Sequence, residues 1–335
     1  MAVIGETYLN IADKIKRQTP DGERIATIIE LLSDTNEIMS DMITMEGNTQ
    51  TGHRTTMRSG LPSVTFRKLY GYTQPSKSTT VQVDETCALM EGFSIVDEDL
   101  AELSGDAASL RLSEDTAFFE AMNQEFAEKL FYGNTDTDPE QFLGLSPRFG
   151  DLSADTGSQI VDAGGTGSDN TSIWLIKWGE NYIHGIYPKG TSAGLMHNDM
   201  GKQTETDANG GKRVVYQTQY KWKTGLALRD YRHIVRIANI DVSDLATIGT
   251  GSDSSADLIN LMIDALEDKL QNRTGGQLVF YCNRKIFTAL TKKAVAKENV
   301  NLTYENFGGE GPILAFQGVP IRRCDAILNT EARVV

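Results

Sequence analysis

Apolar and polar positions follow a helical period over the longest patterned segment of the chain, residues 107–132. Large apolar residues recur there at spacings of three and four, which places them on one stripe of a helix: Phe119, Met122, Phe126 and Leu130. The pattern stops at Gly133, a residue type that favours the end of a helix. We therefore predict a helix of about 26 residues, roughly 39 Å long.

The segment before this helix has a two-residue alternation instead. Runs rich in Thr, Val and Phe, which favour strands, cover residues 54–59, 63–69 and 78–83. Turn-forming residues separate the runs at Gly60 and Pro75. The pattern predicts an extended hairpin with too few large apolar side chains for a core of its own. Because isolated hairpins are only marginally stable in water, we expect this one to lie on another surface.

The rest of the chain mixes helix and strand patterns without a regular βαβ rhythm. The predicted helices cover residues 23–32, 258–270 and 283–297, and the predicted strands cover residues 172–178, 214–222, 233–240, 278–282, 313–316 and 319–328. This order favours an α+β fold over a doubly wound sheet.

Charge is unevenly distributed along the chain. The whole sequence has 46 acidic and 32 basic residues and a formal net charge of −14, which argues against a general nucleic-acid binder. Residues 84–140 alone sum to −14, whereas residues 47–83 contain no acid and sum to +5. Residues 1–46 sum to −5, and residues 141–335 sum to zero. The acidity is therefore concentrated in one stretch that directly follows a basic one.

These two stretches form a candidate interface between copies of the chain. The basic residues are Arg54, Arg58, Arg67, Lys68 and Lys77. The acidic residues, which fill much of the helix circumference outside the apolar stripe, are Glu114, Asp115, Glu120, Glu125 and Glu128. We expect both sets to make inter-subunit contacts. The alternative is an ordinary amphipathic helix with a solvated acidic face.

The sequence contains no recognisable catalytic, cofactor or metal motif. Its four histidines are far apart, and the cysteines Cys87, Cys282 and Cys324 form neither a CxxC unit nor a complete disulfide set. The glycine-rich runs match neither GxGxxG nor a P-loop, and GxSxG is absent. No apolar run reaches the ~18 residues of a membrane span, and the first residues do not resemble a signal peptide. We therefore expect a protein of a reducing cytoplasm that is not an enzyme and has no cofactor, metal or membrane partner.

Five segments carry a family resemblance: GHRTTMRSGLPSVTFRKL, RLSEDTAFFEAMNQ, DAGGTGSDNTSIWLIKWG, RIANIDVSDL and GVPIRRCDAIL. They resemble major capsid proteins of short-tailed double-stranded DNA bacteriophages of the epsilon-fifteen type, and the similarity runs along nearly the whole chain. The resemblance implies the Hong Kong 97 capsid fold. It maps residues 1–46 to an N-arm, 47–86 to an extended loop, 87–150 to a peripheral domain with the spine helix 107–132, 151–311 to an axial domain with insertions, and 312–335 to a return into the peripheral domain. The place of residues 214–240 stays open.

The same resemblance implies a function. Copies of the chain are expected to form pentamers and hexamers that close, without covalent cross-links, into an icosahedral shell around packaged double-stranded DNA. Implied partners are a scaffolding protein and a portal protein, with a decoration or stapling protein left open; the implied location is the virion, assembled in the bacterial host cytoplasm. Some relatives cross-link the loop by a Lys–Asn isopeptide bond, for which Lys68 and Lys77 are donors by position, but no acceptor is identified. An encapsulin-like compartment that encloses cargo enzymes is the alternative.

Overall fold

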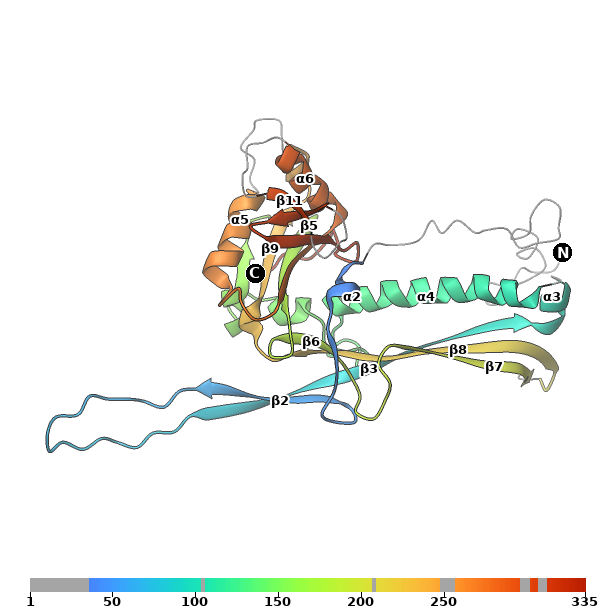
Figure 1. Cartoon of the computed structure of the whole chain (residues 1–335), viewed down its shortest axis with the longest axis horizontal. Helices are drawn as coiled ribbons and strands as arrows, with labels where there is room; N and C mark the ends of the chain where they lie inside the picture. Colours follow the sequence, from blue (N-terminus) through green and yellow to red (C-terminus); the bar gives the residue numbers. More distant parts are fainter. Residues whose placement is uncertain (1–35, 104–105, 207–208, 248–256, 296–301, 307–311) are drawn as a thin grey trace.

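The computed structural model describes residues 36–103, 106–206, 209–247, 257–295, 302–306 and 312–335. The molecule has three parts, which Figure 1 shows side by side: a body of sheet and short helices, an elongated platform with one long helix, and a hairpin that projects away from the platform. The α+β expectation is confirmed. The helix predicted over residues 23–32 lies outside the described residues.

The platform consists of helix α4 (Ala107–Tyr132) laid along three long strands, β3 (Thr79–Asp97), β8 (Lys212–Leu228) and β7 (Leu195–Thr206). The helix has the predicted bounds. Asp106 begins it, because its carboxylate accepts a hydrogen bond from the Ser109 backbone N–H at 3.1 Å. Short helix α3 (Glu98–Leu103) follows β3 at the far end of the platform.

The apolar stripe of α4 faces the sheet, as its spacing predicts. Met122, Phe126 and Leu130 are buried, and the Phe126 ring stacks on Trp222 of β8 with centroids 4.6 Å apart. Phe119, halfway along the helix, stays 40% exposed. The N-terminal turn of the helix is covered again, because Leu110 is buried in a cluster with Val96, Leu100 and Ala101.

The hairpin consists of β2 (Gly52–Gly60) and the first half of β3, paired antiparallel. Residues 61–78 between them form no strand, so the strand predicted over residues 63–69 is wrong. Among the described residues no strand pairs with residues 63–69, and Pro62, directly before them, has no backbone N–H to donate to one. Strand β3 runs without interruption through the predicted boundary between residues 86 and 87, so hairpin and platform share one continuous strand.

The body is built on the two faces of β5 (Asn170–Trp178), β9 (Ile234–Asp241) and β10 (Gln277–Cys282), which pair as β9-β5-β10. One apolar cluster packs between this sheet and helices α5 (Leu258–Asp264) and α6 (Arg284–Val295). A second cluster lies on the other side, against the C-terminal end of α4 and helix α2 (Ile38–Asp41). The helix predicted over residues 258–270 continues past α5 as a π-helical turn, Ala265–Lys269.

The remaining elements are short. Strands β11 (Leu302–Asn306), β12 (Pro312–Phe316) and β13 (Val319–Arg323) extend the body sheet beside β10, and β4 (Ile160–Asp162) pairs with β9. Strands β1 (Thr44–Glu46) and β6 (Ile183–Tyr187) connect body and platform, because β6 pairs with β1, β5 and β8. The 3-10 turns are Ser146–Phe149, Asp155–Gln159, Tyr231–His233 and Asp244–Thr247.

The strand pairing places two segments of the expected division more closely. The open segment 214–240 is split, since β8 belongs to the platform and β9 to the body. Strands β12 and β13 pair with β11 and β10 in the body rather than returning to the long helix. The segment that follows β13 does contact α4, because the Leu328 backbone N–H donates to the Tyr132 hydroxyl at 3.0 Å and Tyr132 donates to the carboxylate of Glu331.

Candidate assembly surfaces

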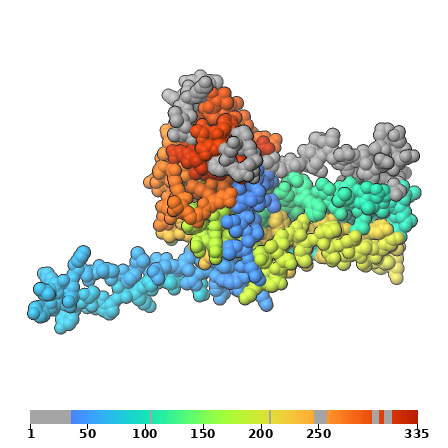
Figure 2. Space-filling model, in the orientation of Figure 1, coloured from blue at the N-terminus to red at the C-terminus, as the bar shows by residue number. Residues whose placement is uncertain are grey.

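The tip of the hairpin, residues 61–78, carries large apolar side chains that contact little else. Six of them are more than 80% exposed: Leu61, Val64, Phe66, Leu69, Tyr70 and Tyr72. Figure 2 shows the hairpin extending from the rest of the molecule with free space on both sides. A contiguous exposed apolar patch of this kind marks an interaction surface. The sequence pattern predicted the hairpin, but it did not show that the apolar side chains at its tip are exposed.

The cations predicted along the hairpin have different environments. Arg54 is bound within its own chain, because its guanidinium donates to both carboxylate oxygens of Asp84 across the strand pair, at 2.6 and 2.7 Å. Arg67, Lys68 and Lys77 lie on the exposed tip, where Arg67 donates to the Gly71 carbonyl at 3.3 Å. Arg54 therefore already has an acidic partner within its own chain, in an ion pair that stays exposed.

The acids predicted along α4 are likewise not equivalent. Glu125 and Glu128 are exposed, and both lie within reach of Lys129, at 3.3 and 3.2 Å. Glu120 accepts a hydrogen bond from Gln124 at 2.8 Å, and Glu114 is half-buried. Helix α4 thus presents a partly compensated acidic face.

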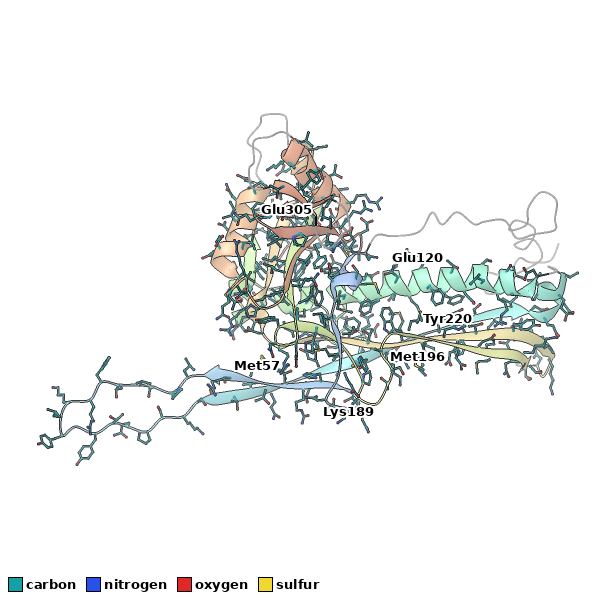
Figure 3. All side chains as sticks on the ribbon, in the orientation of Figure 1. Met57, Glu120, Lys189, Met196, Tyr220 and Glu305 are labelled. Atoms are coloured by element: carbon teal, nitrogen blue, oxygen red, sulfur yellow. The ribbon has the colours of Figure 1, made fainter. Side chains whose placement is uncertain are left out.

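Asp115, which we expected to contact a neighbouring copy, is the exception among these acids. It is buried under the platform sheet with 9% exposure, because its position on the helix turns it toward β8 rather than to water. Burial and the neighbouring Asp115 carboxylate raise the pKa of Tyr220. Figure 3 shows Tyr220 between helix and sheet, with Glu120 on the opposite, open side of α4.

The face of the platform sheet that points away from α4 is also uncovered. Side chains of β3 alternate across the sheet, so Met90 packs toward the helix while Leu89 and Phe93 point away and are 50% and 42% exposed. Met196 of β7 lies on the same side (Figure 3), opposite Lys221 in the strand register. A mixed surface of apolar, lysine and glutamine side chains results. The sequence did not reveal it, because the alternation in residues 87–97 was not interpreted as a strand.

The base of the hairpin is held by buried polar contacts. Arg148 donates to both carboxylate oxygens of Glu85 at 2.6 Å, and both side chains are at most 10% exposed. Beside them the rings of His53 and His184 meet edge to face with centroids 5.6 Å apart. Burial and the nearby Arg229 lower the pKa of both histidines, that of His184 to about 4. Both rings are therefore neutral at physiological pH.

The described residues offer little that resembles reaction chemistry. Burial raises the pKa of the Cys87 thiol to about 11 and also raises that of Cys282, which disfavours a nucleophilic thiolate. Within the same residues no three His, Cys, Asp or Glu side chains come together as a metal cluster. None of the helices described has the length and apolar character needed to cross a bilayer. What the geometry supplies is surface for contact with other proteins.

Comparison with solved structures identifies the class of protein. The chain superposes on a cryo-EM structure of bacteriophage Epsilon15 with a TM-score of 0.78 and 38% identity, covering 100% of this chain and 99% of that one. Two more distant matches are the capsid of bacteriophage JBD30 (13% identity, TM-score 0.48, 88% and 92% covered) and the SrpI encapsulin of Synechococcus elongatus PCC 7942 (10%, 0.42, 69% and 94%). The fold is a Hong Kong 97-like capsid fold, as expected.

The family follows from the sequence itself. Residues 19–335 match the model of the family described as Major capsid protein GP7, so the chain belongs to that family of phage major capsid proteins. No curated protein matches the chain. The expectation of a phage capsid protein is therefore confirmed.

Proposed function

We propose that copies of this chain form pentamers and hexamers, which close without covalent cross-links into an icosahedral shell around packaged double-stranded DNA. Membership of the capsid protein family over residues 19–335 and the full-length similarity to the Epsilon15 protein support this. The observation that carries the proposal is the projecting hairpin with its uncovered apolar tip. A protein that functions as a monomer rarely exposes so many apolar side chains to water, so this surface indicates contact with another molecule.

In this proposal the parts of the molecule take the roles known for the fold. Residues 1–46 act as the N-arm, the hairpin as the extended loop, and α4 as the spine helix. The platform serves as the peripheral domain and the body as the axial domain near the capsomer centre. The pairing of β8 with β3 supports assigning β8 to the peripheral domain, although it lies in sequence within the expected axial segment.

The tip of the hairpin docks on an adjacent copy. Burying an exposed Leu, Val or Phe side chain stabilises a contact by about 1.5–3 kcal/mol, whereas an exposed ion pair adds about 0–1 kcal/mol. Affinity therefore comes mainly from the apolar tip. The cations Arg67, Lys68 and Lys77, meeting Glu114, Glu120, Glu125 and Glu128 of the neighbour, set register and association rate.

Assembly requires further proteins that are not encoded in this chain. A scaffolding protein controls closure, a portal protein occupies one vertex, and a decoration or stapling protein remains open. Shells are built in the bacterial cytoplasm and become part of the virion. DNA is enclosed without sequence-specific contacts, which accords with the net charge of −14.

The test is electron microscopy of the expressed chain, with and without its scaffolding protein, for the wild type and the double variant Phe66→Ser, Leu69→Ser. We expect shells from the wild type and unassembled capsomers from the variant, with an unchanged melting temperature of the subunit. The conservative pair Phe66→Leu, Leu69→Met keeps the apolar surface and should assemble. Normal shells from the serine variant would contradict the role of the tip.

An encapsulin-like compartment is the competing function. The similarity to the SrpI encapsulin is too distant to support it. The contents of native particles separate the two, because a phage shell contains DNA and an encapsulin contains cargo protein.

A further inference from the structure

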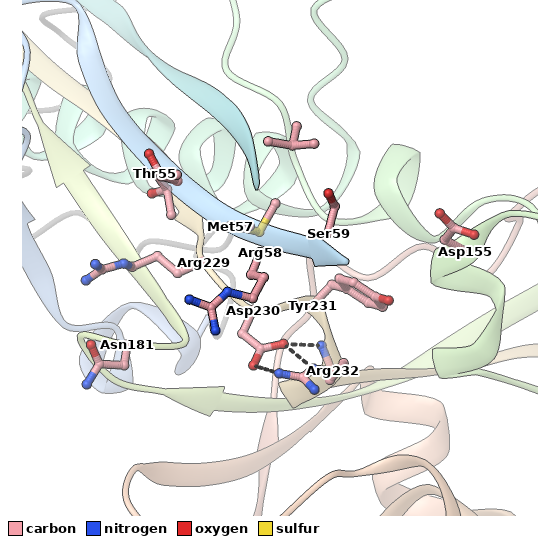
Figure 4. A pocket seen from close by; sticks show the side chains of 12 residues that line it. Thr55, Met57, Arg58, Ser59, Asp155, Asn181, Arg229, Asp230, Tyr231 and Arg232 are labelled. Atoms are coloured by element: carbon pink, nitrogen blue, oxygen red, sulfur yellow. Dashed lines mark hydrogen bonds and ion pairs between the residues drawn. The ribbon is translucent and has the colours of Figure 1, made fainter. Parts of the chain in front are cut away.

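A groove lies under the hairpin, between strand β2 and the body. Its volume is about 640 Å³, and residues 55–59 with Val81 line one wall. Asn181 and the consecutive residues 229–232 line the other, and Asp155 lies at one end (Figure 4). The groove belongs to none of the surfaces described above.

The hairpin wall of the groove is a strand edge. Side chains of a strand point alternately to opposite faces, so a cavity lined by five consecutive residues runs along the edge of β2 rather than over one face. Among the described residues β2 pairs only with β3. Every second backbone N–H of such an edge strand points away from its partner and is available to an acceptor.

The groove also holds positive charge that this chain does not neutralise. The Arg232 guanidinium is occupied by Asp230, at 2.8 and 2.9 Å. Arg229 donates one hydrogen bond, to the Glu180 carbonyl at 3.0 Å. Within the described residues neither Arg229 nor Arg58 has a carboxylate partner. Two arginines and a row of edge amides thus face a space that suits carboxylate groups.

One acidic segment of the chain has the matching chemistry. The turn after α4, residues 134–141, is fixed by its own hydrogen bonds, including Gln141 Nε2 to Asp138 at 2.7 Å. It exposes Asp136 and Glu140, for which the described residues supply no cation. Some other exposed acids have a cation nearby: Glu125 and Glu128 have Lys129, and Glu267 has Arg273.

From this complementarity we infer that the groove binds the acidic turn 134–141 of a second copy, with Asp136 and Glu140 received by Arg58 and Arg229. The inference rests on the proposed self-assembly and adds a second contact to the hairpin, at its base rather than at its tip. It also gives Arg58 an acceptor other than the acids of α4.

A phosphate backbone is the less suitable occupant. Nucleic-acid surfaces need arrays of Lys and Arg, whereas here Asp155 and Asp230 lie in the same groove as the two free arginines. A turn that presents two separated carboxylates can avoid these acids. A continuous row of phosphates would meet them.

The experiment is a charge exchange in the assembling protein. The variant Arg58→Glu, Arg229→Glu should lower the yield of shells in a sucrose gradient about tenfold or more. Adding Asp136→Arg and Glu140→Arg to it should restore the yield. A matched control adds Glu125→Arg and Glu128→Arg instead, which reverses acids of α4 and should not restore it.

Each outcome decides a separate point. Unchanged assembly of the Arg58→Glu, Arg229→Glu variant, or rescue by the α4 reversal alone, would overturn the assignment of the groove. Loss of duplex DNA binding by that variant, with shells intact, would assign the groove to nucleic acid. A wild-type chain that forms no shells with its scaffolding protein would contradict the proposed function itself, whatever the variants do.

Discussion

Arg148 and Glu85 form a two-bond ion pair at 2.6 Å that joins the base of the hairpin to the 3-10 turn Ser146–Phe149. Arg148 also donates to the carbonyls of Leu143 and Gly144 at 3.0 and 3.1 Å. The guanidinium therefore has four protein acceptors in a site with little water. This arrangement fixes the direction in which the hairpin leaves the platform, and so where its tip arrives on a neighbouring copy.

Breaking this pair should destabilise the subunit. Glu85→Gln leaves the Arg148 charge buried without its carboxylate, a change that costs about 3–5 kcal/mol. Urea unfolding of the dissociated subunit measures it. The exposed pair of Arg54 and Asp84 on the same hairpin provides the matched control, because Asp84→Asn should cost less than about 1 kcal/mol. Equal losses from the two variants would contradict the assignment of a structural role to Arg148.

The sequence could not reveal this pair, because its members are 63 positions apart. Glu85, Asp84 and Asp115 all lie in residues 84–140, the acidic stretch that we expected to contact other copies. The structure pairs the first two within the chain and buries the third. Net charge along a sequence therefore overestimated the charge that is available to a partner.

A second prediction concerns Gly133, at the end of α4. Gly133 ends the helix as we predicted, and its φ of −54° does not require a glycine. A Cβ there would lie 2.5 Å from the Phe142 carbonyl oxygen and 2.6 Å from that of Lys129. Gly133→Ala should therefore cost about 1–3 kcal/mol through overpacking. Gly210→Ala is the contrasting variant, because φ there is +82° and open space surrounds it; thermal unfolding of both variants distinguishes a steric effect from a conformational one.

Local sequence patterns are sufficient to predict some elements of this fold but not others. Helix α4 was predicted to the residue, since its period persists over seven turns and its partner sheet lies on one side only. Strand β7 and the full length of β8 were not predicted. Many of their side chains are polar and exposed, so the alternation of apolar and polar residues is weak there. The groove under β2 could not be predicted for another reason: its two walls come from residues 55–59 and 229–232, which are about 170 positions apart in the sequence.

A third prediction concerns the C-terminal residues. Glu331 accepts hydrogen bonds from Arg236 at 2.9 Å and from Ser172, and all three side chains are buried. Removing residues 331–335 leaves the Arg236 charge in the body without its carboxylate. We expect a loss of about 3–5 kcal/mol and insoluble expression. The double variant Arg236→Met with Glu331→Gln removes the charge together with its partner and should recover much of the stability. Soluble, normally melting protein after the truncation would contradict the role of Glu331.

The last prediction is a pH dependence at the base of the hairpin. Burial, His53 and Arg229 lower the pKa of His184 from 6.5 to about 4, so the folded state favours the neutral ring. The contribution of this residue is present above pH 6.5 and decreases as the pH falls toward 4, because the unfolded chain then binds a proton that the folded chain does not. Between pH 7 and pH 5 the subunit should lose about 1–2 kcal/mol from this group. His184→Gln should flatten that part of the stability curve, measured by urea unfolding at several pH values. His197→Gln, on the exposed strand β7, should leave the curve unchanged; an equally steep curve for the His184 variant would exclude this group as the cause.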